Sequence, residues 1–166
     1  MFYDSDPFFL EIVSEFLENP HYQQIDKFIA HGDWTVLDHS LNVASLCYEI
    51  GKRKGLELDY RSLIRAAMLH DFYCYDWHLP HKGKRLHGFR HPGFAIKEAS
   101  KYFELSPFEK KLIHVHMFPL TFWRFPLSKE ARLLVKCDHI SALYEHKYRK
   151  NDRLRKRTLM QYAFGG

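Results

Sequence analysis

The chain has 166 residues, enough for one domain with a sizeable core, and its 46% of hydrophobic residues excludes a disordered composition. No apolar run approaches the ~20 residues that span a bilayer, and the acidic start MFYDSDPFFL is unlike a secretory signal, so we expect a cytoplasmic protein without a membrane partner. The net charge of +5 suits an anionic substrate or a nucleic acid.

Helix start and stop signals are frequent along the chain, and strand-like alternation is nearly absent. Asp6-Pro7 and Asn19-Pro20 each pair an N-cap residue with a proline at the first helical position, and Ser106 opens an S-x-x-E capping box. His31-Gly32 is expected to end the second helix, and Pro92 to begin the fifth. These signals predict seven helices, over approximately residues 7–16, 20–31, 35–54, 59–71, 92–103, 107–118 and 129–148. We therefore expect an all-α helical bundle.

Four polar residues fall on the apolar faces of three of these predicted helices. They are His39, His70, Asp71 and Asp138. A single histidine on an apolar face is usually a hydrogen-bonded core residue. An ionised carboxylate, however, costs several kcal/mol to bury, so two aspartates and two histidines directed inward need a shared cause. A bound metal ion would supply it.

The order of these residues resembles the H…HD…D signature of the HD-domain superfamily of metal-dependent phosphohydrolases. His39 lies in LDHSLNVA, the His70-Asp71 dyad in AAMLHDF and Asp138 in KCDHISALYE. The resemblance covers about residues 33–145 and implies a single helical HD domain over 1–166, with a basic tail over 147–166. It also implies that the four residues bind one divalent metal, and that Asp71 can bridge to a second.

Two more histidines are candidates for a second metal ion. His91, in RHPGFAIKEA, is expected at the N-cap of the fifth helix and resembles an element of dinuclear HD proteins; its alternative role is a simple helix cap. On the sixth helix, His116 shares a face with apolar residues. His114 instead lies on the polar face with Lys110 and Lys111, which precede it by four and three residues. We therefore predict His116, and not His114, as the ligand. The phrases HMFPL and HDFYCYDWH resemble a subgroup of bacterial HD proteins.

The segment after the dyad departs from better-known HD proteins. Cyclic-dinucleotide phosphodiesterases carry HD-x-G-K and a later GYP motif, but this chain has Cys74 in place of the lysine and lacks GYP. The glutamate of the mononuclear nucleotidases is missing as well. Asp76 is a weak candidate for the acid or base; alternatively, Asp76 and Trp77 only fix the loop. The three cysteines show no CxxC spacing, which argues against a disulfide framework.

The predicted activity is metal-assisted hydrolysis of a small phosphorylated substrate, a nucleotide or another phosphoester. One or two ions of Fe, Mn, Ni or Zn would suit mixed imidazole and carboxylate ligands. Lys84, His87 and Arg90 lie in the long irregular segment 72–90 and either meet phosphate charge or form a solvated basic loop.

Two other interpretations remain open. Some dinuclear iron HD proteins are oxygenases, which an O₂-dependent product would reveal. A regulatory or RNA-binding module would keep its metal for structure and use the basic tail as a contact surface, although a solvated tail is favoured over a nucleic-acid patch.

Overall fold

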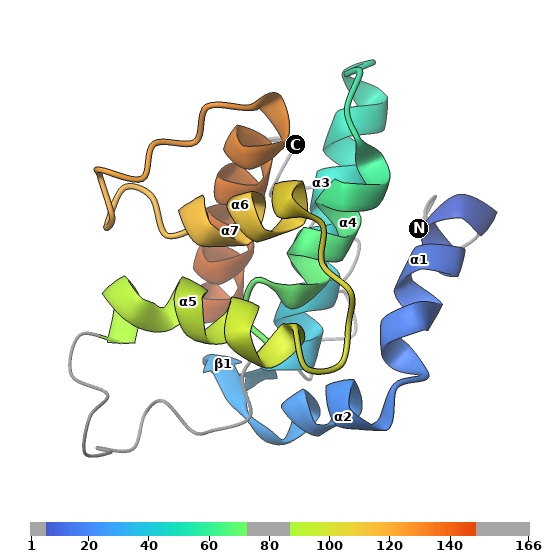
Figure 1. Cartoon of the computed structure of the whole chain (residues 1–166), viewed down its shortest axis with the longest axis vertical. Helices are drawn as coiled ribbons and strands as arrows, with labels where there is room; N and C mark the ends of the chain where they lie inside the picture. The colour runs from blue at the N-terminus through green and yellow to red at the C-terminus, as the bar shows by residue number, and fades with distance from the viewer. Residues whose placement is uncertain (1–5, 73–86, 149–166) are drawn as a thin grey trace.

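The computed structural model describes residues 6–72 and 87–148, with the backbone alone for 87–89. Within these residues, the chain forms seven α-helices, one 3₁₀ helix and one small hairpin (Figure 1). In chain order, the elements are α1 (Pro7–Leu17), α2 (Pro20–Gln23), the 3₁₀ helix η2 (Gln24–Lys27), β1 (Ile29–His31), β2 (Trp34–Thr35), α3 (Val36–Arg53), α4 (Tyr60–Leu69), α5 (His87–Ala99), α6 (Pro107–Val115) and α7 (Lys129–Lys147). The predicted all-α fold is confirmed.

Side-chain caps explain where most of these helices begin. At each cap a side-chain oxygen accepts a hydrogen bond from a backbone N–H of the first turn, which the helix itself leaves without a partner. Thr35 and Ser106 form complete capping boxes, with Asp38 and Glu109 respectively. The capping residues are Asp6, Asn19, Thr35, Asp59, Ser106 and Ser128.

Helix α3 lies at the centre of the bundle, where it packs against α4 and α7, while α4 also contacts α1 and α6. An aromatic cluster fills the space under the end of α4. There the rings of Tyr22 and Phe72 stack with centroids 5.3 Å apart. The Tyr22 hydroxyl donates a 2.5 Å hydrogen bond to the carbonyl of Met68, two residues before His70. This contact fixes the end of α4, where the His-Asp dyad begins.

The helix predicted over 20–31 was wrong in its second half. Helical geometry ends at Phe28, which is extended, and residues 29–31 pair with β2 in an antiparallel hairpin. Gly32 lies in the turn with φ +61, a backbone conformation that residues other than glycine rarely adopt. The apolar spacing over residues 20–29 is compatible with a helix. The chain leaves helical geometry because residues 29–31 pair with β2, which comes after this segment. The signal that we interpreted as a helix stop is a hairpin turn.

Predicted helix boundaries differ in α4, α5 and α6 as well. Helix α4 ends at Leu69 and α5 at Ala99, earlier than the expected 71 and 103. Helix α5 begins at His87, so Pro92 lies inside it and His91 is not its N-cap. Pro92 is the sixth residue of α5, so it removes only one early backbone hydrogen bond. Helix α6 ends at Val115, with His116 as its C-cap, instead of continuing to Pro119. No helix in the described parts of the chain has the length and apolar character needed to cross a membrane.

Candidate metal centre

The four residues of the H…HD…D pattern meet at one point of the bundle. His39 comes from α3, His70 is the C-cap of α4 with Asp71 directly after it, and Asp138 comes from α7. The Nε2 atom of His39 lies 3.1 Å from Oδ1 of Asp138 and 3.3 Å from Nε2 of His70. The Nε2 atom of His70 lies 3.5 Å from Oδ1 of Asp71. One ion could reach His39, His70 and Asp138 together, since their ligand atoms all lie within 4.8 Å of one another.

A second group of ligand atoms adjoins the first and is formed by Asp71, His91 and His116. Oδ1 of Asp71 lies 2.6 Å from Nε2 of His91 and 3.6 Å from Nε2 of His116. Oδ2 of the same carboxylate lies 3.9 Å from Nε2 of His39. Oδ1 also lies 3.5 Å from Nε2 of His70, so the Asp71 carboxylate is within 4 Å of ligand atoms of both groups. This is the position expected of a ligand that the two groups share.

The protonation of Nδ1 in two histidines follows from its contacts. The Nδ1 of His70 lies 2.7 Å from the carbonyl of Ala67, and that of His116 lies 2.7 Å from the carbonyl of Ile113. A carbonyl only accepts hydrogen bonds, so each Nδ1 carries the proton. In the neutral rings, the Nε2 lone pairs then point into the cluster, as metal coordination requires.

These donors fit a cation better than they fit one another. Neutral rings, which metal coordination requires, would direct the Nε2 lone pairs of His39 and His70 at each other across 3.3 Å, and lone pairs repel. Without a cation the cluster favours protons instead. Burial lowers the pKa of His39 and of His70, but the carboxylates of Glu145, Asp71 and Asp138 outweigh it and raise both. The Nε2 atom of His116 is buried and has no hydrogen-bond partner among the described residues. Imidazole nitrogens together with carboxylates suit divalent transition metals. The residues present therefore fit the metal that the sequence pattern implies.

The electrostatics of the cluster favour positive charge. Burial raises the pKa of Asp71, but His70 and His91 outweigh it and hold that pKa well below its usual range. Burial also raises the pKa of Asp138, but hydrogen bonds from His39 and His70 outweigh it and lower that pKa. Burial, with His70 nearby, lowers the pKa of His116 to about 3. The site thus holds two ionised carboxylates whose charge is balanced by protons on neighbouring histidines or by a cation, while His116 stays neutral.

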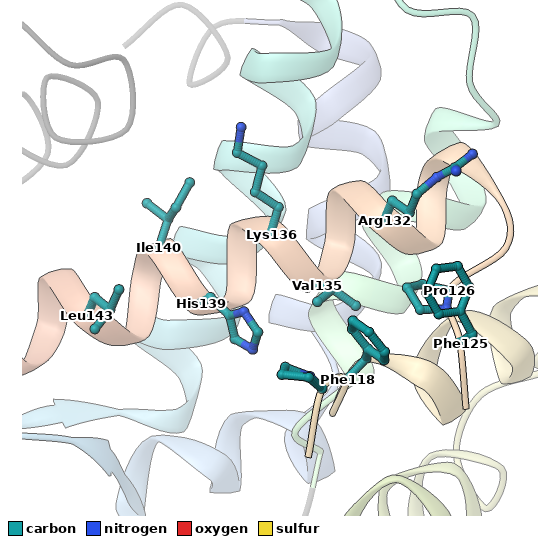
Figure 2. Close-up of a pocket in the computed structure, with 10 residues that line it drawn as sticks. Phe118, Phe125, Pro126, Arg132, Val135, Lys136, His139, Ile140 and Leu143 are labelled. Carbon is teal, nitrogen blue, oxygen red and sulfur yellow. The ribbon is translucent and has the colours of Figure 1, made fainter. Parts of the chain in front are cut away.

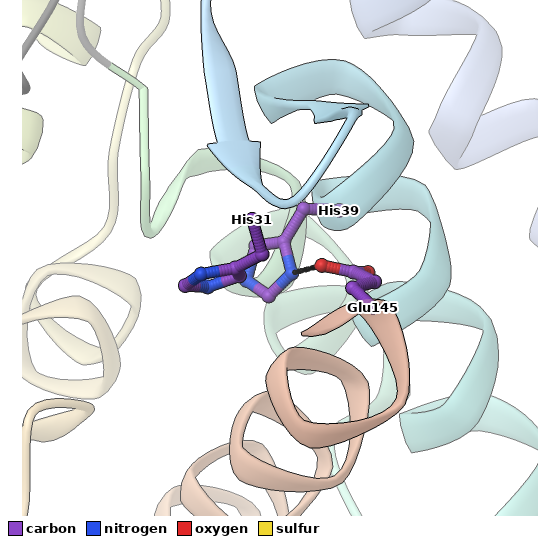
Figure 3. Close-up of side chains that lie close together, drawn as sticks. All are labelled: His31, His39 and Glu145. Carbon is purple, nitrogen blue, oxygen red and sulfur yellow. Dashed lines mark hydrogen bonds and ion pairs between the residues drawn. The ribbon is translucent and has the colours of Figure 1, made fainter. Parts of the chain in front are cut away.

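Glu145 is a buried part of the site that the sequence analysis missed. Its Oε2 accepts a 2.8 Å hydrogen bond from Nδ1 of His39 (Figure 3). Its Oε1 accepts from Asn42 and Ser141 at 2.9 and 2.7 Å. Burial raises the pKa of Glu145, but the interaction with His39 outweighs it and lowers that pKa. The signal was available, because Glu145 lies seven residues after Asp138 and hence on the same face of α7.

His31 also approaches the site, from the hairpin. Its ring meets that of His39 edge to face, with centroids 5.0 Å apart, and a ligand atom lies near those of His39 and Glu145 (Figure 3). Burial, followed by the effect of His39, lowers the pKa of His31 to about 4, so its ring is neutral at pH 7. Sequence reasoning missed this residue because it assigned His31 to the end of a helix.

The other predicted site residues lie away from the cluster or outside the described residues. His114 is exposed, whereas His116 is buried within the cluster. Arg90 is exposed on α5. Asp76, Lys84 and the side chain of His87 lie outside the described residues. Of the cysteines, Cys47 and Cys137 are free and buried.

Comparison with known families finds one matching family model. The HD domain family matches residues 36–143, a stretch that runs from the first residue of α3 nearly to the end of α7. The chain belongs to the HD-domain family. This family is part of the superfamily of metal-dependent phosphohydrolases. No curated protein and no solved structure matches the chain.

Proposed function

We propose that this protein is a metal-dependent phosphohydrolase with a dinuclear centre that acts on a small phosphorylated substrate. The observation that carries the proposal is the position of the Asp71 carboxylate between two groups of ligand atoms, with Oδ1 3.5 Å from Nε2 of His70 and 2.6 Å from Nε2 of His91. His39, His70 and Asp138 would hold one ion, and His91 and His116 the other. A mononuclear centre would leave the buried Nε2 of His116 without a role.

The residues of the site have separate roles in this proposal. Divalent ions, when bound, supply Lewis acidity that lowers the pKa of water and neutralises phosphoryl oxygens. Asp71 holds the two groups in register. Glu145 orients the ring of His39, and the carbonyls of Ala67 and Ile113 orient those of His70 and His116. The side chains of Asp71 and Asp138 are each 13% exposed. A substrate would approach from this exposed side of the cluster.

Asp71→Asn tests the proposal most directly at the level of activity. The substitution keeps the side-chain volume but removes a charge that both ions need. Bound metal should decrease and hydrolysis of phosphoesters should drop by several orders of magnitude, because generation of hydroxide depends on that charge. The measurement is metal analysis of unchelated protein, followed by a screen of nucleotides and phosphoesters with Mn²⁺. Glu57→Gln, at an exposed carboxylate on the loop after α3, is the matched control and should change neither.

Two outcomes would contradict the phosphohydrolase proposal. Full hydrolysis by Asp71→Asn would remove Asp71 from the reaction. A wild-type protein that binds metal but is inert across the whole phosphoester panel would favour an oxygenase if a product requires O₂, and a regulatory module if none forms.

A further inference from the structure

The connection between α6 and α7 exposes an unusual number of large apolar side chains. It extends away from the helices as the orange segment of Figure 1. Phe122 is 72% exposed, Leu127 66% and Trp123 56%. The rings of Phe122 and Trp123 meet edge to face, 5.0 Å apart. Contiguous apolar surface of this kind marks a contact site, because leaving it in water costs free energy.

A groove of about 460 Å³ lies beside this connection, between it and α7. One wall is formed by the connection, with the Phe118 and Phe125 rings 5.2 Å apart (Figure 2). The other wall is the outer face of α7, where Val135, Ile140 and Leu143 lie along the helix. The groove therefore continues the apolar surface of the connection on to α7. We call the two together the apolar face, formed by residues 117–127 and the groove side of α7.

The charged side chains that line the groove have one sign. Arg132 and Lys136 line the groove, and both are exposed. None of the described residues that line the groove is acidic, and residues 117–129 contain no aspartate or glutamate. An occupant of this face should therefore combine an apolar part with negative charge.

We propose that the apolar face docks on an anionic phospholipid membrane. Phe122, Trp123 and Leu127 would enter the interface, where amphipathic rings such as tryptophan prefer to lie. Arg132 and Lys136 would meet lipid phosphates. We expected no membrane partner because the sequence lacks a spanning segment, but docking at the surface does not require one.

Two other occupants fit the same observations less well. A second copy of the chain would bring the cations of one groove close to those of its twin, and like charges repel. A single-stranded nucleic acid would use aromatic rings for stacking on bases. It would gain little from Leu127, Ile140 and Leu143, which have no ring.

Vesicle sedimentation tests the proposal with the full chain. The probes are vesicles of phosphatidylcholine alone and of phosphatidylcholine mixed with phosphatidylglycerol. We expect partition into the mixed vesicles, weakened by high salt. Trp123→Ser should reduce it at least about tenfold, through lost apolar burial. Arg132→Gln and Lys136→Gln should each reduce it about fivefold.

Two control variants match these changes on other elements. Leu10→Ser removes an exposed apolar side chain from α1, and Lys54→Gln removes an exposed cation from the end of α3. Both should partition as the wild type does. Because binding is measured without hydrolysis, the result is independent of the proposed activity.

Three results would overturn the proposal. The first is the absence of partition into the mixed vesicles, or equal partition by all variants. The second is a dimer in light scattering that Trp123→Ser dissociates, which would assign the face to a second copy. The third is binding of polyuridylate that the same variants weaken, while vesicles fail to bind.

Discussion

The Nδ1 atoms of His39, His70 and His116 face acceptors of two kinds. Backbone carbonyls serve His70 and His116, so no substitution at the accepting residue can remove those hydrogen bonds. His39 instead depends on the Glu145 carboxylate. A carboxylate behind a metal-binding histidine fixes the ring and raises its basicity. The orientation of His39 is therefore the part of the centre that a single side chain controls.

Removal of the Glu145 carboxylate should weaken metal binding without removing a ligand. We expect Glu145→Ala to lower metal affinity roughly 10- to 100-fold. Glu145→Gln should have a smaller effect, because its amide oxygen can still accept from Nδ1 of His39. Competition with a chelator measures both.

Glu49→Ala is the matched control, since Glu49 is a buried carboxylate of α3 that pairs with Arg53. Its metal affinity should equal that of the wild type. Equal affinities for Glu145→Ala and the wild type would show that Glu145 does not position His39.

At the scale of elements, the hairpin and α7 meet behind the metal centre. A Cβ atom added at Gly32 would lie 3.0 Å from the backbone carbonyl oxygen of Glu145. This close contact can be relieved only by a shift of the hairpin or of α7. The turn that sequence reasoning took for a helix end thus supports the residue that orients His39.

Gly32 and Gly55 form a natural pair of test sites. Both have positive φ, at +61 and +60, but a Cβ atom at Gly55 would meet nothing within 4 Å. Gly55→Ala should cost only the backbone strain, about 1 kcal/mol, or roughly 2–4 °C in Tm. Gly32→Ala should cost more and should also weaken metal binding. Thermal unfolding and chelator competition would measure the two effects, and an equal loss of stability in both variants would argue against the Glu145 contact.

The elements that the sequence predicted correctly are those with local signals. Capping residues such as Ser106 and Ser128 act within one turn, so the starts of α6 and α7 could be read directly. The hairpin pairs Ile29 with Thr35, but its strands of three and two residues are too short for an alternating pattern, and its turn glycine is also a helix-stop signal. For α5, Pro92 indicated a helix start, but it lies inside the helix. Among the candidate ligands, helical phase was enough to separate His116 from His114, because burial in a helix follows its period.

At the scale of the molecule, the candidate ligands come from α3, α5 and α7 and from the C-terminal ends of α4 and α6. A metal centre would therefore connect five elements that otherwise meet through side-chain packing. A ligand that binds only the folded state stabilises it by about 4 kcal/mol at a thousand times its Kd.

Removal of metal should accordingly lower the thermal stability of the whole domain. For a chain of this size, the loss corresponds to a decrease in Tm on the order of 10 °C. Calorimetry of metal-loaded and chelator-treated protein, with metal content measured on both, would detect it. Unchanged Tm after complete removal of metal would indicate that the centre does not stabilise the fold.

The central claim is that two metal ions share Asp71, and anomalous diffraction from crystals of metal-loaded protein tests it most directly. We predict two anomalous peaks roughly 3.5–4 Å apart. One peak should have His39, His70 and Asp138 as ligands, the other should have His91 and His116, and Asp71 should contact both. A single peak at full loading, or a peak bound by His114, would contradict the account.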